Sequence, residues 1–168
     1  PLQPAASSNL LAGFVISTVL IIIIWALSGI FIVSPAEQAV ILKFGRYKST
    51  VEPGPHWIPR FIQSKTIVNI QQISTYPYQA QMLTKDQNIV DVSVAVQYRI
   101  IDPKNYLFNI VAPVKSLEQV TASALRQVIG NTNLDDVLTT GRAAIRDAVG
   151  QQINQILAIY KTGIFITD

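Results

Sequence analysis

Residues 90–100 of the chain, VDVSVAVQYRI, form its clearest pattern and decide its fold. Apolar and polar side chains alternate throughout this stretch, so every second residue falls on the same side of an extended backbone. A period of two is typical of an antiparallel strand that has one face buried and the other in water. The predicted buried face holds Val90, Val92, Val94, Val96, Tyr98 and Ile100.

Shorter strands precede this one. Residues 37–44, EQAVILKF, alternate in the same way, with Val40, Leu42 and Phe44 on one face. Residues 66–73, TIVNIQQI, predict another strand. Between the two, residues 52–55, EPGP, predict a turn, because proline fixes φ and glycine permits positive φ.

The period changes after Pro113. Apolar residues recur at helical spacing as far as Gly130 and again over about residues 140–160, with a short helix beginning near Asn133. Residues 164–168, IFITD, resemble the beginning of a last strand. Strands followed by helices predict an α+β domain, in which helices cover a mainly antiparallel sheet.

The N-terminal part differs in character, because the stretch from Leu10 to Val33 includes Trp25 but no charged side chain. About 20 apolar residues cross a bilayer. A cleaved signal peptide has an apolar run of only about 7–15 residues, and a buried helix averages about 11–12. We therefore expect a linker tail at 1–9, a transmembrane helix at 10–33 and one domain at 34–168. Because the first residue is Pro1, we also expect a fragment of a longer protein.

The charges flanking the predicted span bear on its orientation. No Lys or Arg precedes it, whereas Lys43, Arg46 and Lys48 follow it closely. Cytoplasmic loops are enriched in Lys and Arg, so this pattern alone favours a cytoplasmic domain. Elsewhere the charges are scattered without runs, which gives no electrostatic footprint for nucleic acid.

A proline-bounded loop at residues 56–62, HWIPRFI, concentrates large apolar side chains. One interpretation is a membrane-interface loop, since Trp is favoured in the headgroup layer and Arg60 could meet headgroups. The other is that these side chains cap the core of the domain itself. The candidate interface residues are Trp57, Ile58, Phe61 and Ile62.

Residues with catalytic or metal-binding potential are few. The chain has no cysteine, and its one histidine, His56, could join only Glu52, fewer ligands than a metal site needs. Asp135 and Asp136 lie at a predicted helix start, which favours capping over paired-carboxylate chemistry. No G-x-S-x-G elbow or phosphate-binding glycine loop occurs. We predict no catalytic, cofactor or metal site, and a membrane-anchored hydrolase is the enzymatic alternative.

Several motifs in one order carry a resemblance to a known family. They are PAEQAVILKFGRY (35–47), EPGPHWIPRFI (52–62), MLTKDQNIVDVSVAVQYRI (82–100), DPKNYLF (102–108) and SALRQVIGNTNLDDVLTTGRAAI (123–145). The chain resembles the SPFH (stomatin/prohibitin, band 7) superfamily from Leu10 to Asp168. Within the superfamily it is most similar to the bacterial branch whose members pair with HflC.

This resemblance implies a non-enzymatic scaffold in the bacterial inner membrane, with its SPFH domain on the periplasmic side, contrary to the charge pattern. It implies a large hetero-oligomeric ring, built with an HflC-like SPFH protein around an FtsH-like membrane protease, that controls which membrane proteins reach the protease. It also implies a helical region after the domain. A stomatin-like scaffold that organises the membrane without a protease partner is the alternative.

Overall fold

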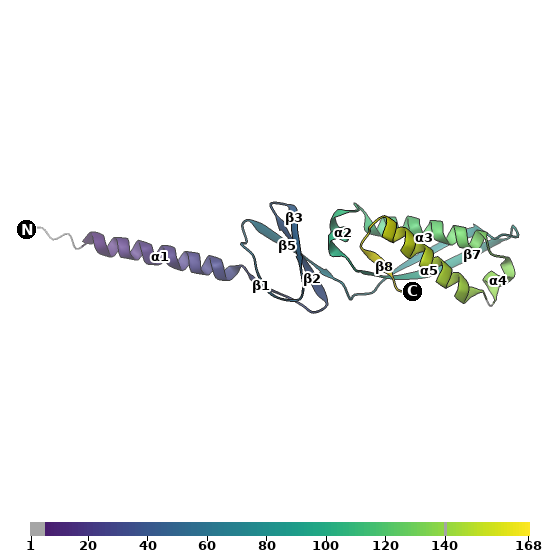
Figure 1. The fold of residues 1–168 in the computed structure, drawn as a ribbon, viewed down its shortest axis with the longest axis horizontal. Coiled ribbons are helices and arrows are strands. Elements are labelled where there is room, and N and C mark those ends of the chain that lie inside the picture. Colours follow the sequence, from purple (N-terminus) through teal and green to yellow (C-terminus); the bar gives the residue numbers. More distant parts are fainter. Residues whose placement is uncertain (1–5, 140) are drawn as a thin grey trace, which may run out of the picture.

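The computed structural model describes residues 6–139 and 141–168, with side chains from residue 12 onward except at position 140. A helix, a small β unit and a larger α/β unit follow one another along the long axis of the molecule (Figure 1). Pro1 to Ala5 of the predicted tail lie outside the described residues, as does the side chain of Leu10.

Helix α1 (Ala6–Ser28) begins inside the predicted tail and ends before the predicted boundary at Val33. Residues Ile30–Val33 instead form strand β1, so the predicted helix end is wrong. The backbone of Ile58 approaches Gly29 so closely that a Cβ at residue 29 would lie 2.3 Å from the Ile58 carbonyl oxygen. The Ile58 N–H donates to the Gly29 carbonyl at 3.0 Å, which draws the chain out of the helix and into the sheet.

Among the side chains that the structure describes, we find no helix that combines the length and the apolar character needed to cross a membrane.

The β unit consists of two small antiparallel sheets. Strand β1 pairs with β4 (Gly54–Trp57), and β2 (Glu37–Lys43) lies between β3 (Arg46–Val51) and β5 (Gln63–Asn69). Strand β2 begins where it was predicted, whereas β5 begins three residues earlier than the predicted strand at 66–73. A compact core holds the two sheets together and comprises Phe31, Val33, Ala39, Ile41 and Ile58.

The larger unit, which we call the α/β unit only because it contains both helices and strands, confirms the predicted α+β class. Strand β6 (Ser74–Leu83) pairs along its whole length with β7 (Ile89–Ile100), which contains the alternating stretch, and β8 (Ile164–Ile166) pairs with the end of β7. Helices α2 (Pro103–Phe108), α3 (Pro113–Gly130), α4 (Leu134–Leu138) and α5 (Arg142–Ile159) follow β7. Figure 1 shows α3 and α5 on one side of this sheet.

Burial explains this arrangement. The even-numbered residues of β7 are half-buried or buried, and the odd-numbered ones are exposed. The apolar stripes of α3 and α5 pack onto that even-numbered face. The apolar face of the strand and those of the two helices therefore form one core. The largest fully buried side chains of this core are Leu117, Leu125, Ile129, Ile153 and Leu157.

Gly163 joins β8 to the end of β7. Its carbonyl accepts hydrogen bonds from Ile101 N–H at 2.8 Å and from Asp102 N–H at 3.2 Å. Its φ is +73°, and a Cβ there would lie 2.3 Å from the Asp102 carbonyl oxygen. Only glycine fits this left-handed, crowded position.

We therefore expect Gly163→Ala to lower the free energy of unfolding by about 1–3 kcal/mol, because backbone strain and overpacking act together. The matched control is Gly150→Ala in α5, where an added Cβ meets nothing within 4 Å. That variant should gain up to about 1 kcal/mol from helix propensity. Thermal unfolding of the protein in detergent, followed by circular dichroism, measures both, and equal stability of the two variants would contradict the assignment.

Candidate functional site: an exposed apolar end and a groove beside β7

The four residues predicted for a membrane-interface loop separate into two groups. Ile58 is only 5% exposed and packs in the core of the β unit, so it is not available to a bilayer. Trp57, Phe61 and Ile62 are 52%, 84% and 40% exposed. Each of the two interpretations of the loop thus fits part of it: core packing fits Ile58, and an open apolar surface fits the other three.

Phe44 adds a fourth exposed side chain beside this loop. It lies in the turn between β2 and β3 with φ of 51°, followed by Gly45 with φ of 78°, a pair of positive φ values typical of two-residue hairpins. Phe44 is 75% exposed and follows the end of β2, so it does not lie on the strand face where it was predicted with Val40 and Leu42. Its N–H donates to the Ile62 carbonyl at 3.2 Å, which ties the turn to the loop.

We call Phe44, Trp57, Phe61 and Ile62 the apolar end. Strand alternation misses Phe44 because it continues the β2 pattern past the true end of the strand at Lys43. The signal that could have found it is the Phe44-Gly45 pair between two short strands, since glycine at the second turn position favours a tight hairpin.

The apolar end lies next to the C-terminus of α1. The indole N–H of Trp57 donates to the Ala26 carbonyl at 2.6 Å. Ala26 belongs to the last turn of the helix, where carbonyls have no partner within the helix itself. Trp57 therefore caps α1 with its nitrogen and leaves much of its ring exposed beside the helix.

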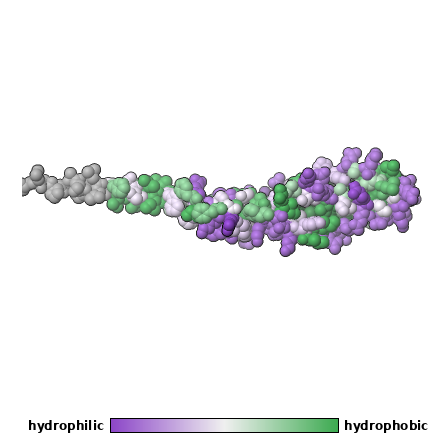
Figure 2. Space-filling view, turned by 90° about the horizontal axis from the view of Figure 1, so that it is seen from above, coloured by the Kyte–Doolittle hydropathy of each residue, from purple (hydrophilic) through white to green (hydrophobic). Residues whose placement is uncertain are grey.

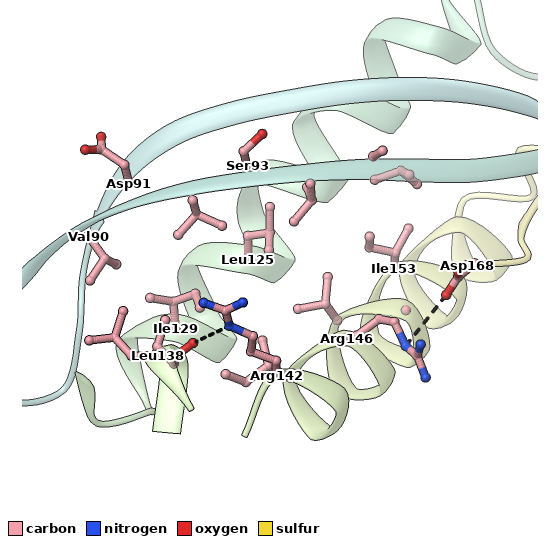
Figure 3. A pocket seen from close by; sticks show the side chains of 18 of the residues that line it. Val90, Asp91, Ser93, Leu125, Ile129, Leu138, Arg142, Arg146, Ile153 and Asp168 are labelled. Carbon is pink, nitrogen blue, oxygen red and sulfur yellow. Dashed lines mark hydrogen bonds and ion pairs between the residues drawn. The ribbon is translucent and has the colours of Figure 1, made fainter. Parts of the chain in front are cut away.

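A groove lies on the opposite part of the molecule, between β7 and the helices α3, α4 and α5 (Figure 3). Its volume is about 770 Å³, within the range of about 300–1,000 Å³ found for small-molecule sites. Val90 from β7, Leu125 and Ile129 from α3, and Ile153 from α5 point into it, whereas Asp91 and Ser93 point away (Figure 3).

The polar groups at the rim of the groove are engaged with one another. The Arg142 guanidinium donates to the Val137 carbonyl at 3.4 Å, and Arg146 lies 3.6 Å from Asp168. The hydrogen bond that Asp147 accepts from Arg146 raises the pKa of that guanidinium, so it stays cationic. No cluster of three or more His, Asp or Glu that could hold a metal occurs among the described residues. An apolar wall with paired charges at its edge suits binding rather than catalysis.

Strand β7 borders the groove with an open edge. Strand β8 pairs only with residues 98–100, and Gln97 exchanges hydrogen bonds with Thr167 and Asp168. Within the part of the chain that the structure describes, residues 89–96 pair with β6 alone. The backbone N–H and C=O groups of alternate residues face the same side of a strand. Those of Gln97 face the open edge, so those of Asp91, Ser93 and Ala95 face it too. An added strand could therefore pair here with its apolar side chains over the groove.

Comparisons with known proteins place these features in a family context. The sequence model of the SPFH domain / Band 7 family matches residues 31–168. The chain is 41% identical to "Protein HflK" of Vibrio cholerae over 165 residues, 98% of this chain and 42% of the relative. It is 39% identical to "Modulator of FtsH protease HflK" of Escherichia coli K12 over 153 residues, 91% of this chain and 36% of the relative. The chain thus spans about two fifths of the length of these relatives.

The α4 wall of the groove depends on Asp86, in the turn between β6 and β7. Its carboxylate accepts hydrogen bonds from the Thr84 hydroxyl at 2.6 Å and from the Leu134 N–H, at the start of α4, at 3.1 Å. The Asn88 side-chain amide donates to its other oxygen at 2.8 Å. These hydrogen bonds, that from Thr84 above all, lower the pKa of Asp86 below its ordinary value of 3.8.

A lowered pKa in the folded state stabilises the protein above the unfolded pKa, and this contribution disappears as the pH falls through the folded pKa. We expect Asp86→Asn to reduce the free energy of unfolding at neutral pH, and its deficit to vanish well below pH 3.8. Urea titrations at both pH values measure this. The matched control is Asp91→Asn, because Asp91 is exposed and makes no hydrogen bond among the described side chains. A similar pH-dependent deficit in the control would refute the assignment.

Proposed function

We propose a scaffold function for this chain, starting from the fact that it belongs to the SPFH domain / Band 7 family. The observation that carries the proposal is the identity of about 40% to relatives named HflK, over nearly the whole chain. One of those relatives is named a modulator of the FtsH protease. In this proposal the chain is a non-enzymatic, HflK-like membrane protein that regulates how membrane proteins reach an FtsH-like protease.

The first element of the proposal is anchoring by α1. Its 23 residues, with no charged side chain, are about 34 Å long at 1.5 Å per residue, against a bilayer core of about 30 Å. The described side chains from Phe14 to Leu27, including Trp25, are largely exposed and apolar (Figure 2). A helix that is apolar all round suits a membrane span, and Ser28 rather than Val33 would be its last residue.

The second element is contact between the apolar end and the bilayer surface. Trp57, Phe61, Ile62 and Phe44 are exposed, and Trp57 is bonded to the last turn of α1. If α1 spans the membrane, this bond keeps the apolar end at the depth of the headgroups, where aromatic rings are favoured.

The third element is assembly. Chains tethered in one membrane plane raise each other's effective concentration, so weak lateral contacts suffice to build a large particle. In our proposal an HflC-like SPFH protein alternates with this chain in a ring around the FtsH-like protease. The domain lies on the periplasmic side of a bacterial inner membrane. The apolar lining of the groove and the scarcity of nucleophile and base pairs support a non-enzymatic role.

Affinity purification of the full-length protein in mild detergent tests the partners. We expect an HflC-like protein and an FtsH-like protease to be recovered together in a megadalton particle, identified by mass spectrometry and sized by light scattering. A homo-oligomer lacking both would favour the stomatin-like alternative. A matched purification of a variant with α1 replaced by an unrelated transmembrane helix distinguishes partners held by the domain from those held by α1.

Cysteine labelling tests the orientation, and residues 1–168 contain no cysteine that would add to the background. We expect Gln81→Cys, on the exposed face of β6, to react with a membrane-impermeant maleimide in cells whose outer membrane alone is permeabilised. Reaction only after lysis would place the domain in the cytoplasm, as the flanking charges favour. The cysteine-free parent is the control for nonspecific labelling.

A further inference from the structure

The net charge of the chain is confined to one part of it. Residues 29–73 contain five basic and two acidic residues, which gives +3, the whole net charge of the protein. Residues 74–168 contain eight of each and are neutral. The basic excess therefore belongs to the β unit, which follows α1 directly.

The cations of the β unit gather at the apolar end. Lys43 and Arg46 face each other across the turn that carries Phe44, and Arg60 immediately precedes Phe61. Lys43 also pairs with Gln63, the residue after Ile62, so the turn and the loop lie side by side. All three cations are exposed.

The two acidic residues lie at the other end of the same sheet. Glu37 starts β2, whereas Lys43 ends it, and a seven-residue strand is about 20 Å long. Glu52 follows Val51, which pairs with Ala39 near that far end. The only ion pairs among the described residues involve Arg146, so Lys43, Arg46 and Arg60 have no acidic partner there.

The two remaining cations are engaged within the β unit. The Lys65 ammonium lies 3.9 Å from the centre of the Phe31 ring, and Lys48 donates to the Gln63 side chain at 3.5 Å. The set that has no such engagement is therefore Lys43, Arg46 and Arg60, three cations around two exposed phenylalanine rings. We call this set the basic rim of the apolar end.

We propose that the basic rim binds the phosphate headgroups of anionic phospholipids while Phe44 and Phe61 enter the interfacial layer beneath them. This inference rests on the proposed contact between the apolar end and the membrane, and adds the class of lipid. Charge complementarity selects the occupant, because cations beside an anionic membrane surface gain attraction that a zwitterionic surface lacks. The adjacent rings and α1 favour a lipid surface over a soluble anion, which would not bury them.

Tryptophan quenching tests the inference in the full-length protein. Within residues 1–168, Trp25→Phe leaves Trp57 as the one tryptophan, bonded to α1 and beside the basic rim, and any tryptophan outside this range is also replaced by phenylalanine. The protein is reconstituted in two kinds of phosphatidylcholine bilayer. One contains a fraction of phosphatidylglycerol brominated near the headgroup, and the other contains the same fraction of phosphatidylcholine brominated at the same place. We expect brominated phosphatidylglycerol to quench Trp57 with a several-fold higher relative association constant. About 0.5 M salt, where the Debye length is about 4 Å, should reduce this preference.

Lys43→Gln, Arg46→Gln and Arg60→Gln together should bring the ratio of the two association constants to about one. The matched control neutralises Lys85, Lys115 and Arg126, three exposed cations of the neutral α/β unit, and should keep the preference. Equal quenching of the parent by both lipids overturns the headgroup inference and leaves the membrane contact standing. Absence of quenching by either lipid overturns both. Quenching of the Trp25→Phe protein alone decides between these outcomes, so the inference can be refuted even if the variant without the basic rim fails to fold.

Discussion

The close approach of Gly29 to Ile58 is the constraint on which the remaining geometry depends. A side chain at residue 29 would collide with the Ile58 carbonyl, and its absence allows the Ile58 N–H to reach the Gly29 carbonyl. The same approach brings the Trp57 indole to the last turn of α1. The helix and the β unit are therefore joined by paired backbone and side-chain groups rather than by a linker, which fixes which end of the unit lies beside α1.

The contact between the α/β unit and the β unit involves a few side chains of α2 and β3. The Lys104 ammonium of α2 lies 4.7 Å from the centre of the Tyr47 ring in β3. The Phe108 ring meets the same ring edge-on, with 6.1 Å between the two ring centres. These are exposed or half-exposed groups, in contrast to the buried cores on either side. Each unit therefore has its own buried core, and side chains of α2 make an aromatic contact between the two units.

Much of the fold was predictable because periodicity reports burial. The alternation of β7 and the apolar stripes of α3 and α5 predicted the α/β unit, and the comparisons confirm the family that the ordered motifs indicated. The end of α1 was not predictable, since the group that excludes a side chain at Gly29 comes from Ile58, far along the chain. Nor could composition separate Ile58 from Phe61: both are apolar members of one loop, and only the tertiary pairing buries the first and exposes the second.

The open edge of β7 has a consequence for the behaviour of the protein at high concentration. Within the described residues, the N–H and C=O groups that alternate residues of 89–96 present to this edge have no partner strand, and beside valine side chains they are a template for intermolecular strand pairing and aggregation. Asp91 is the one charged residue of that stretch. Its carboxylate acts as a gatekeeper, because a second copy of the edge stacked against the first would bring like charges together. The resistance of this edge to intermolecular strand pairing thus depends on one negative charge.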